Sequence, residues 1–258
     1  VQAYGEKNLQ DAIDKYDIKN GAFCIVMDVN TGEIKAMATL GSYDPNNYLE
    51  IYDDTTALLL ENERAAALAL PEASAAYEAA IETYKQDVAA ARMAQWRNRC
   101  VSDGYEPGST FKLITLASAL DSGAVTLNDS FYCGGQEKFT GREQILNCWK
   151  SAGHGAQTTA QALGNSCNIA FGHIGLRMGG DTFYDYLKSF GVMEKTGVDL
   201  PGEASGLFYE RKYLNDPANY GTSYLITSSF GQSFRITPMQ LVRAVAAIVN
   251  GGYVLEPY

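Results

Sequence analysis

The sequence predicts an α+β fold, and three observations support this class. Two short apolar runs flank a turn sequence near the start of the chain, as in a β-hairpin. The middle of the chain has the apolar spacing of helices, and the last segment returns toward a sheet. Grouped strands and grouped helices are typical of α+β folds, whereas alternating strands and helices indicate βαβ units.

The expected hairpin consists of strands at residues 22–28 and 33–39, with the sequence Asn-Thr-Gly between them. Asn and Gly tolerate the left-handed backbone that tight hairpin turns require. Together with an N-terminal helix, this hairpin makes up the predicted first segment, 1–53.

Residues 54–98 are rich in Ala and Glu and are predicted to form a helical insertion. Apolar side chains recur there every three or four positions and form one stripe on a helix, namely Tyr77, Ile81, Tyr84, Val88 and Ala91. Pro71 separates this helix from a shorter one before it. The stripe can serve as an arm for a partner or hold a helical hairpin on its own domain, and the second interpretation is favoured.

The next segment, 99–200, is predicted to contain a helix that carries the active site and a helical subdomain. A helix is expected from Ser109 to Gly123, because Gly is a common residue after a helix end. Thr158 begins a Thr-Thr-Ala-Gln capping box, which opens a short helix. A further helix, rich in small and apolar residues, follows Asn168.

The last segment, 201–258, is predicted to return toward the sheet. Its one clear helix starts at Thr237, where Thr-Pro-Met-Gln supplies an N-cap, a proline at the first helical position and a glutamine at the third. The helix is expected to end at Asn250, which two glycines follow.

Composition and charge exclude several classes of function. The 258 residues are 46% hydrophobic and 19% charged, as in ordinary globular proteins. The net charge is −10, so no basic surface for nucleic acid is expected. No apolar run approaches the ~20 residues of a membrane span, and no signal peptide is visible. The five cysteines form no C-x-x-C pair, so neither a metal site nor a redox motif is expected.

The sequence Ser109-Thr110-Phe111-Lys112 can supply a nucleophile and its base. A serine hydroxyl needs a base within hydrogen-bond reach, and positions i and i+3 of a helix share one face. Apolar neighbours favour burial of Lys112, which lowers the pKa of a lysine. Gly108 has no Cβ and lets a substrate approach closely. A surface serine and lysine on one helix is an alternative of equal weight.

Ser166-Cys167-Asn168 is predicted to lie between two short helices, on a loop that can face Ser109. Ser166 can relay a proton to a leaving group, and Asn168 can bind a peptide backbone. Asn is also a good helix N-cap, so plain capping by Asn168 is favoured when the triplet is considered alone.

The two histidines are poor candidates for a catalytic base. His154 lies in Ala-Gly-His-Gly and is predicted to brace the region of Ser166 from a turn. His173 lies in an apolar stretch and is predicted to be a core histidine with satisfied hydrogen bonds. A Ser-His-Asp hydrolase is therefore disfavoured.

S-x-x-K followed by S-x-N is the signature of penicillin-binding proteins and serine β-lactamases. The chain resembles most the class B penicillin-binding proteins, above all the cell-division and sporulation transpeptidases of Gram-positive bacteria. The similarity runs from about residue 8 to 258, apart from the Ala-rich stretch. Seven segments carry it, in this order: DVNTGEIKAMAT, DPNNY, RNRCVSDGYEPGSTFK, NCWKSAGHG, ALGNSCNIAF, GVDLPGEASG and TPMQLVRAVAAIVNGG.

The resemblance implies a fold, an activity and a site. The fold is that of penicillin-binding proteins and serine β-lactamases, an antiparallel sheet covered by helices with a helical subdomain. The activity is acyl transfer from a peptidoglycan stem peptide to Ser109, with Lys112 as the base. Ser166 and Asn168 complete the proton path and the substrate contact. Gly108 and Cys167 are expected to line the substrate site, and no metal or other cofactor is required.

The resemblance also implies partners and a location. β-Lactams would acylate the same serine, because their strained ring mimics the stem peptide. The protein is expected at the extracytoplasmic face of the bacterial cell membrane, anchored by an N-terminal segment outside this sequence, within a cell-wall synthesis complex. A serine β-lactamase or D,D-carboxypeptidase of the same superfamily is one alternative. A non-catalytic β-lactam sensor or scaffold is another.

A third family motif, K-[TS]-G, has one match in the chain, Lys195-Thr196-Gly197. Asp, Pro and Gly residues follow it closely and predict a loop, whereas in the family the motif lies on a strand at the edge of the cleft. The sequence therefore predicts that this copy is not the catalytic one and that the working motif lies beyond Tyr258. The sheet is then expected to be incomplete in this chain and completed by the remaining C-terminal part of the same protein.

Two departures from the family pattern are visible. The insertion at 54–98 is longer than expected, and Gly231-Gln232-Ser233 stands where the family often has G-Q-G.

Cys133 and Cys148 flank a short loop, and the family works where thiols oxidise, so a disulfide between them and two free thiols have equal weight. Closing this loop of roughly 15 residues would contribute about 3 kcal/mol to the free energy of unfolding.

Overall fold

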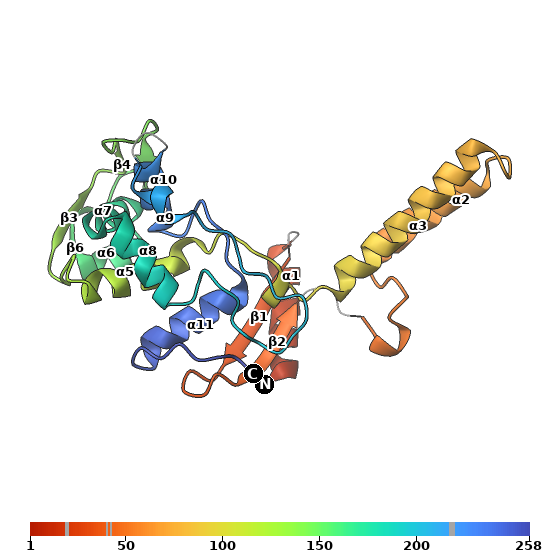
Figure 1. The fold of residues 1–258 in the computed structure, drawn as a ribbon, viewed down its shortest axis with the longest axis horizontal. Coiled ribbons are helices and arrows are strands. Elements are labelled where there is room, and N and C mark those ends of the chain that lie inside the picture. Colours follow the sequence, from red (N-terminus) through yellow and green to blue (C-terminus); the bar gives the residue numbers. More distant parts are fainter. Residues whose placement is uncertain (19–20, 40, 42, 217–219) are drawn as a thin grey trace. The chain divides into compact units, whose positions relative to one another are not determined.

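The computed structural model describes residues 1–258 except 19–20, 40, 42 and 217–219 (Figure 1). Helices predominate, and the strands of the described residues form three two-stranded sheets. Internal contacts divide the chain into two units. Unit 1 comprises Val1–Cys24 and Met37–Arg99, and unit 2 comprises Ile25–Ala36 and Cys100–Tyr258. The predicted α+β class is confirmed.

Unit 1 begins with helix α1 (Gln2–Tyr16), which ends at Asp17 in the left-handed conformation. The Gln2 side chain donates to the Met37 carbonyl and accepts from the Met37 N–H, both at 2.8 Å. Met37 belongs to β2 (Ile34–Thr39), which pairs with β1 (Phe23–Met27) as the predicted hairpin. A short 3₁₀ turn, η1 (Pro45–Asn47), follows.

The Ala-rich insertion folds as two helices, α2 (Asp54–Leu68) and α3 (Ala75–Trp96), that pack against each other. The side chains of Asp53 and Ser74 cap their first turns. The predicted apolar stripe is half-buried along α3, as expected for a face covered by one neighbouring helix. Pro71 lies between the two helices, as predicted. Neither helix contacts another described element extensively, so the hairpin packs on itself more than on its domain.

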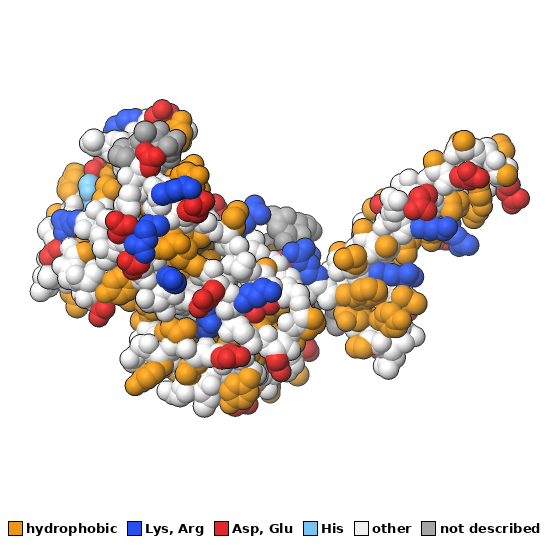
Figure 2. All heavy atoms as spheres, in the orientation of Figure 1, with side chains coloured by type: hydrophobic (Ala, Val, Ile, Leu, Met, Phe, Trp, Pro, Cys, Tyr) orange, Lys and Arg blue, Asp and Glu red, His pale blue; other side chains and the backbone are white. Residues whose placement is uncertain are grey.

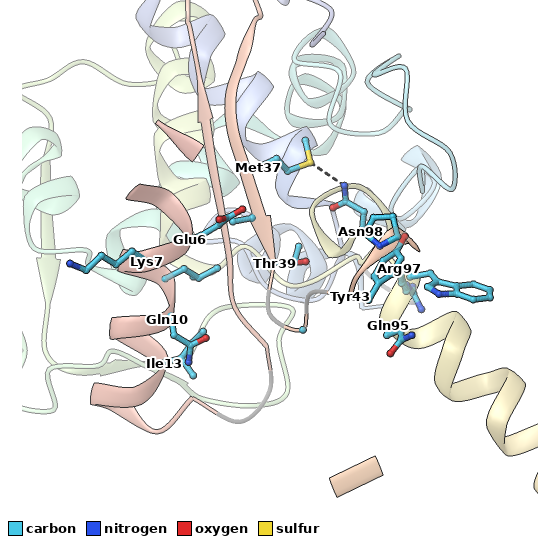
Figure 3. A pocket seen from close by; sticks show the side chains of 15 residues that line it. Glu6, Lys7, Gln10, Ile13, Met37, Thr39, Tyr43, Gln95, Arg97 and Asn98 are labelled. Atoms are coloured by element: carbon cyan, nitrogen blue, oxygen red, sulfur yellow. Dashed lines mark hydrogen bonds between the residues drawn. The ribbon is translucent and has the colours of Figure 1, made fainter. Parts of the chain in front are cut away.

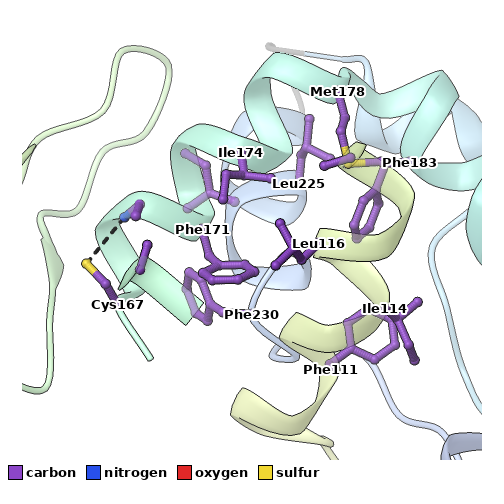
Figure 4. Packing of buried hydrophobic residues seen from close by; sticks show 14 of the residues in the cluster. Phe111, Ile114, Leu116, Cys167, Phe171, Ile174, Met178, Phe183, Leu225 and Phe230 are labelled. Atoms are coloured by element: carbon purple, nitrogen blue, oxygen red, sulfur yellow. Dashed lines mark hydrogen bonds between the residues drawn. The ribbon is translucent and has the colours of Figure 1, made fainter. Parts of the chain in front are cut away.

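Unit 2 contains the largest apolar core of the described residues. The 3₁₀ turn η2 (Gly108–Phe111) leads into α5 (Lys112–Asp121), which packs with α7 (Asn168–Met178) and α8 (Gly180–Ser189). Phe111, Ile114 and Phe171 are fully buried there. Figure 4 shows Phe171, Leu116 and Phe230 converging from separate segments. This packing fixes the two motif-bearing helices relative to each other, because close-packed cores resist displacement.

Shorter elements complete unit 2. The strand β3 (Ser130–Cys133) pairs antiparallel with β6 (Gly155–Thr158), so that Cys133 is opposite Gly155. The strands β4 (Gln136–Glu137) and β5 (Leu146–Asn147) form a second small pair. The remaining helices are α4 (Arg99–Ser102), which begins in unit 1, α6 (Thr159–Gly164), α9 (Arg211–Leu214), α10 (Gly221–Ser228) and α11 (Pro238–Val249).

The last segment lies beside the hairpin within unit 2. After α11, the Asn250 side chain donates to the Val29 carbonyl at 2.8 Å. Tyr258 donates its N–H to the Gly32 carbonyl at 3.2 Å and accepts from the Ile34 N–H at 2.8 Å. These bonds fit the predicted return toward the sheet.

On the face that Figure 2 draws, basic and acidic side chains are interspersed. In the described ranges, no helix combines the length and the apolar character needed to cross a membrane.

Candidate active site

The loop before α5 presents Ser109 to solvent. Gly108 has φ = 58°, a conformation that favours glycine, and donates its N–H to the Gly231 carbonyl at 2.8 Å. Thr110 closes the turn by donating its hydroxyl to the Pro107 carbonyl at 2.7 Å. The helix expected to begin at Ser109 therefore starts as a tight 3₁₀ turn and becomes α-helical only at Lys112. Ser109 remains exposed, as a nucleophile must be.

Lys112 is fully buried one turn after the serine. Its Nζ lies 3.1 Å from the Ser109 Oγ, 2.9 Å from the Ser166 Oγ and 2.8 Å from the Ser166 carbonyl oxygen. The Asn168 Oδ1 is also 2.8 Å away. None of these four oxygen atoms carries a formal charge. Burial therefore dominates and lowers the pKa of Lys112 to about 8, although negative charge on the nearby Cys148 and Cys167 sulfurs would oppose it.

The Ser166–Asn168 loop is held in one conformation by its backbone. Ser166 has φ = 48°, which is uncommon for a residue with a side chain, and donates its N–H to the Leu163 carbonyl at 2.9 Å. Cys167 is the N-cap of α7, with its sulfur accepting from the Ala170 N–H at 3.5 Å (Figure 4). Plain capping by Asn168 is therefore wrong, because Cys167 occupies that position and leaves the Asn168 amide free to contact Lys112.

The side chains of Ser109, Ser166 and Asn168 thus meet at the amine of Lys112, as the two motifs predict. The profile of the penicillin binding protein transpeptidase domain matches residues 22–258. The chain belongs to this family. The match covers both motifs and the hairpin, and it agrees with the class B type expected from the sequence.

Two curated relatives illustrate the similarity of this transpeptidase domain to known proteins. Stage V sporulation protein D of Bacillus subtilis is 34% identical over 259 residues, which cover 100% of this chain and 33% of that protein. Peptidoglycan D,D-transpeptidase MrdA of Escherichia coli K12 is 26% identical over 97% of this chain and 36% of its own length. The domain therefore spans about a third of the length of these relatives.

Solved structures share the fold. A peptidoglycan glycosyltransferase of Burkholderia ambifaria aligns with a TM-score of 0.70 and 23% identity, over 99% of this chain and 62% of its own. Penicillin-binding protein 3 of Mycobacterium tuberculosis, complexed with aztreonam, aligns with a TM-score of 0.72 and 24% identity, over 99% of this chain and 46% of its own.

Sequence reasoning missed the residue that supports the serine loop of this transpeptidase domain. Gly231 has φ = 84°, and a Cβ there would lie 2.1 Å from the Gly108 carbonyl oxygen. Ser233, where the family often has glycine, takes the same left-handed region at φ = 69° and donates its N–H to the Glu106 carboxylate at 2.8 Å. The Gly-Gln pair in the family segment was the signal that could have located this contact.

The Lys195-Thr196-Gly197 triplet lies in a loop, as predicted, outside every described strand. The Thr196 N–H donates to the Glu203 carboxylate at 2.6 Å, and the Thr196 carbonyl accepts from Arg243 at 3.0 Å. These contacts tie the triplet to its own loop and to α11.

The two histidines differ from each other in environment. His154 packs edge-on against Trp149, with ring centroids 5.4 Å apart, and burial lowers its pKa, helped by the charges of Lys150 and Lys112. His173 does not lie in the core, so the expectation of a core histidine is wrong. Its imidazole is partly exposed and lies 2.8 Å from the Glu137 carboxylate.

All five cysteines are free thiols, so the disulfide considered between Cys133 and Cys148 is not formed. Cys167 is fully buried, so its side chain is not accessible from solvent. Any substrate contact at Cys167 must therefore come from its backbone.

Unit 1 contains a separate cavity of about 660 Å³ (Figure 3). Met37, whose sulfur lies 3.1 Å from the Asn98 amide nitrogen, borders it together with side chains of α1 and the end of α3. None of the predicted site residues lines this cavity.

Proposed function

We propose that this domain is the catalytic part of a serine-type peptidoglycan D,D-transpeptidase. One observation carries the proposal: the buried Lys112 amine contacts the Ser109 hydroxyl, the Ser166 hydroxyl and the Asn168 amide oxygen together. A nucleophile, its base and a second hydroxyl are the groups that acyl transfer needs.

Acylation begins with Lys112 in its neutral form. A neutral amine has one lone pair and two N–H groups, so it can accept the Ser109 proton while donating to Ser166 and Asn168. The Ser109 oxygen forms a bond to the carbonyl carbon of the penultimate D-alanine, and the C–N bond to the terminal D-alanine breaks. The proton passes through the Lys112 and Ser166 pair to the leaving amine. The amine of a neighbouring stem peptide then attacks the ester carbonyl, the C–O bond to Ser109 breaks, and the amine proton returns through Lys112 to the Ser109 oxygen.

The pKa of Lys112 suits this role. At about 8 it leaves a useful fraction of the amine neutral at physiological pH, whereas an ordinary lysine is almost wholly protonated. Ser109 lies at the start of the η2 and α5 turns, where free backbone N–H groups favour a developing oxyanion.

We assign substrate contacts to the residues that flank the nucleophile. A Cβ at Gly108 would meet no atom within 4 Å, so open space adjoins the serine there. Cys167 would contribute through its backbone only, since its side chain is buried.

β-Lactams are the second class of ligand that we propose. They carry the strained amide that Ser109 would open, and the similar protein of Mycobacterium tuberculosis was solved with aztreonam. The protein would act at the extracytoplasmic face of the cell membrane, in a cell-wall synthesis complex, with the rest of its own polypeptide. No cofactor takes part in the steps proposed here.

A transpeptidase, a carboxypeptidase and a non-catalytic sensor give different products from the same stem-peptide mimic. With the full chain, a stem-peptide mimic and an acceptor amine, a transpeptidase releases D-alanine and forms the cross-linked product. Mass spectrometry of the products distinguishes this result from hydrolysis, which a carboxypeptidase would give. Release of D-alanine without transfer, or no release at all, would contradict the proposal.

A further inference from the structure

A second group of reactive side chains lies behind the Ser166–Asn168 loop. Cys133 ends β3, Cys148 follows β5, His154 lies in the turn before β6, and Cys167 caps α7. Their three sulfur atoms and one imidazole nitrogen all lie within 4.8 Å of one another. The three cysteines are buried, with at most 6% of each residue exposed. Four separate segments thus bring soft ligand atoms to one point.

The separation between Cys148 and His154 fits a tetrahedral metal site. Zinc bonds of about 2.3 Å to sulfur and about 2.0 Å to nitrogen place neighbouring ligands about 3.8 Å apart for two sulfurs and about 3.5 Å apart for sulfur and nitrogen. The Cys148 sulfur and the His154 Nδ1 are 3.7 Å apart. A disulfide would use only two of the three thiols and would leave the third beside His154.

Backbone N–H groups face the sulfurs of Cys167 and Cys148. The Ala170 N–H donates to the Cys167 sulfur at 3.5 Å, and the backbone N–H groups of Lys150 and Asn168 donate to the Cys148 sulfur. Such hydrogen bonds orient and stabilise sulfur ligands around a metal. The His154 ring directs Nδ1 toward the Cys148 sulfur and packs edge-on against Trp149.

The loops that carry the ligands approach each other at two glycines. A Cβ at Gly135 would lie 1.9 Å from the Ser151 carbonyl oxygen, and a Cβ at Gly153 would lie 2.2 Å from the Cys133 carbonyl oxygen. Both glycines have positive φ, which residues with side chains rarely adopt. The segments that carry the ligands can therefore approach this closely because positions 135 and 153 are glycines.

We propose that Cys133, Cys148, His154 and Cys167 bind one Zn²⁺ in a closed Cys₃His site. Three thiols and one imidazole in tetrahedral arrangement select zinc among the common divalent cations. Four protein ligands leave no open position, so the metal is structural. It would hold the Ser166–Asn168 loop in place, because Cys167 lies between the two residues that contact Lys112. This revises the expectation of no metal, which rested on the missing C-x-x-C spacing.

Metal content of the purified full chain tests the site directly. We expect about one zinc per chain by plasma mass spectrometry, with loss in Cys133→Ser and in His154→Ala. Cys24→Ser is the matched control and should keep its zinc, because Cys24 lies outside the cluster. Equal zinc in all variants, or a wild-type chain that contains none after growth with added zinc, would overturn the proposal.

Cobalt spectroscopy of the wild-type chain tests the site without depending on whether a variant folds. Wild-type chain stripped of metal and titrated with Co²⁺ should give tetrahedral ligand-field bands and a sulfur-to-cobalt charge-transfer band that saturates at one equivalent. His154→Cys should raise the charge-transfer band by about one third, since four thiolates replace three. A spectrum of octahedral cobalt, or a wild-type mass that reveals a disulfide within the cluster, would exclude the site.

The site and the proposed function can fail separately. The metal measurement does not depend on acyl transfer, whereas the positioning role rests on the proposed function. We expect removal of zinc with a chelator to slow labelling by fluorescent penicillin, and added Zn²⁺ to restore it. Labelling at the same rate with and without bound zinc would contradict the positioning role.

Discussion

The chemistry of the site depends on the amine of Lys112. It is fully buried, four uncharged oxygen atoms surround its Nζ, and the Phe171 ring lies 5.5 Å away. Uncharged oxygen atoms accept hydrogen bonds from an ammonium but do not neutralise its charge. The free energy of desolvation is therefore relieved by loss of the proton, which is the physical origin of the lowered pKa.

The rate of acylation by penicillin should rise with pH through about 8. Below the pKa of Lys112 the amine is protonated and cannot accept the Ser109 proton, and above it the amine is neutral. Stopped-flow labelling with a fluorescent penicillin measures this profile. A rate that is constant across this pH range would contradict the assignment of Lys112 as the base.

Replacement of Lys112 by Arg should abolish this profile. Arginine keeps the positive charge but does not lose its proton in the working range, so acylation should slow by at least about 100-fold. Lys188→Arg is a suitable control on the basis of its position in α8, away from the described contacts of Lys112. Near-normal acylation of Lys112→Arg would show that the lysine only supplies charge.

At the scale of elements, the contact between Gly108 and Gly231 positions the nucleophile. The two backbones approach so closely that no side chain fits at Gly231, and the Gly108 N–H bonds to the Gly231 carbonyl. The start of α5 is thereby fixed by a segment that lies more than a hundred residues later in the chain.

Gly231→Ala should lower both stability and acylation. Strain at positive φ costs of order 1–3 kcal/mol, and the new Cβ must also displace the serine loop. Gly123→Ala is the matched control, because Gly123 has φ = 71° but open space around it. We expect urea unfolding to detect a loss in both variants and slower penicillin labelling in Gly231→Ala alone. Unchanged labelling of Gly231→Ala would refute the positioning role of this contact.

The α2 and α3 hairpin should be dispensable for acylation. The start of α2 follows the Tyr48–Leu49 segment closely in the chain, and the end of α3 returns to that segment, since Trp96 and Arg92 donate to the carbonyls of Tyr48 and Leu49. Replacing residues 56–90 with a short Gly-Ser linker should change the penicillin labelling rate by less than about twofold, because loop length affects closure entropy only weakly. A large loss of labelling in a folded deletion variant would assign the hairpin a role in the site.

At the scale of the molecule, features set by neighbouring residues could be predicted from the sequence. The hairpin turn, both Thr and Gln capping boxes and the i, i+3 placement of Ser109 and Lys112 depend on contacts within a few residues. The resemblance to the family implied that the Ser109–Lys112 and Ser166–Asn168 motifs meet in one site.

The remaining features depend on residues that are distant in the sequence, and so local patterns could not reveal them. The Cys₃His cluster joins four segments between Cys133 and Cys167, and the support of Ser109 by Gly231 spans more than a hundred residues. The expectation that Asn168 caps α7, favoured when the triplet is considered alone, rests on the general preference for asparagine at that position. Tertiary contact with Lys112 overrides that preference.

Acylation of Ser109 is the central claim, and the intact mass of the full chain after exposure to benzylpenicillin tests it most directly. We expect one adduct per chain, located by peptide mapping on the segment that contains Ser109. The adduct should be lost in Ser109→Ala and kept in Ser122→Ala, which removes an exposed hydroxyl at the other end of α5. An adduct on another residue, or an undiminished adduct in Ser109→Ala, would contradict it.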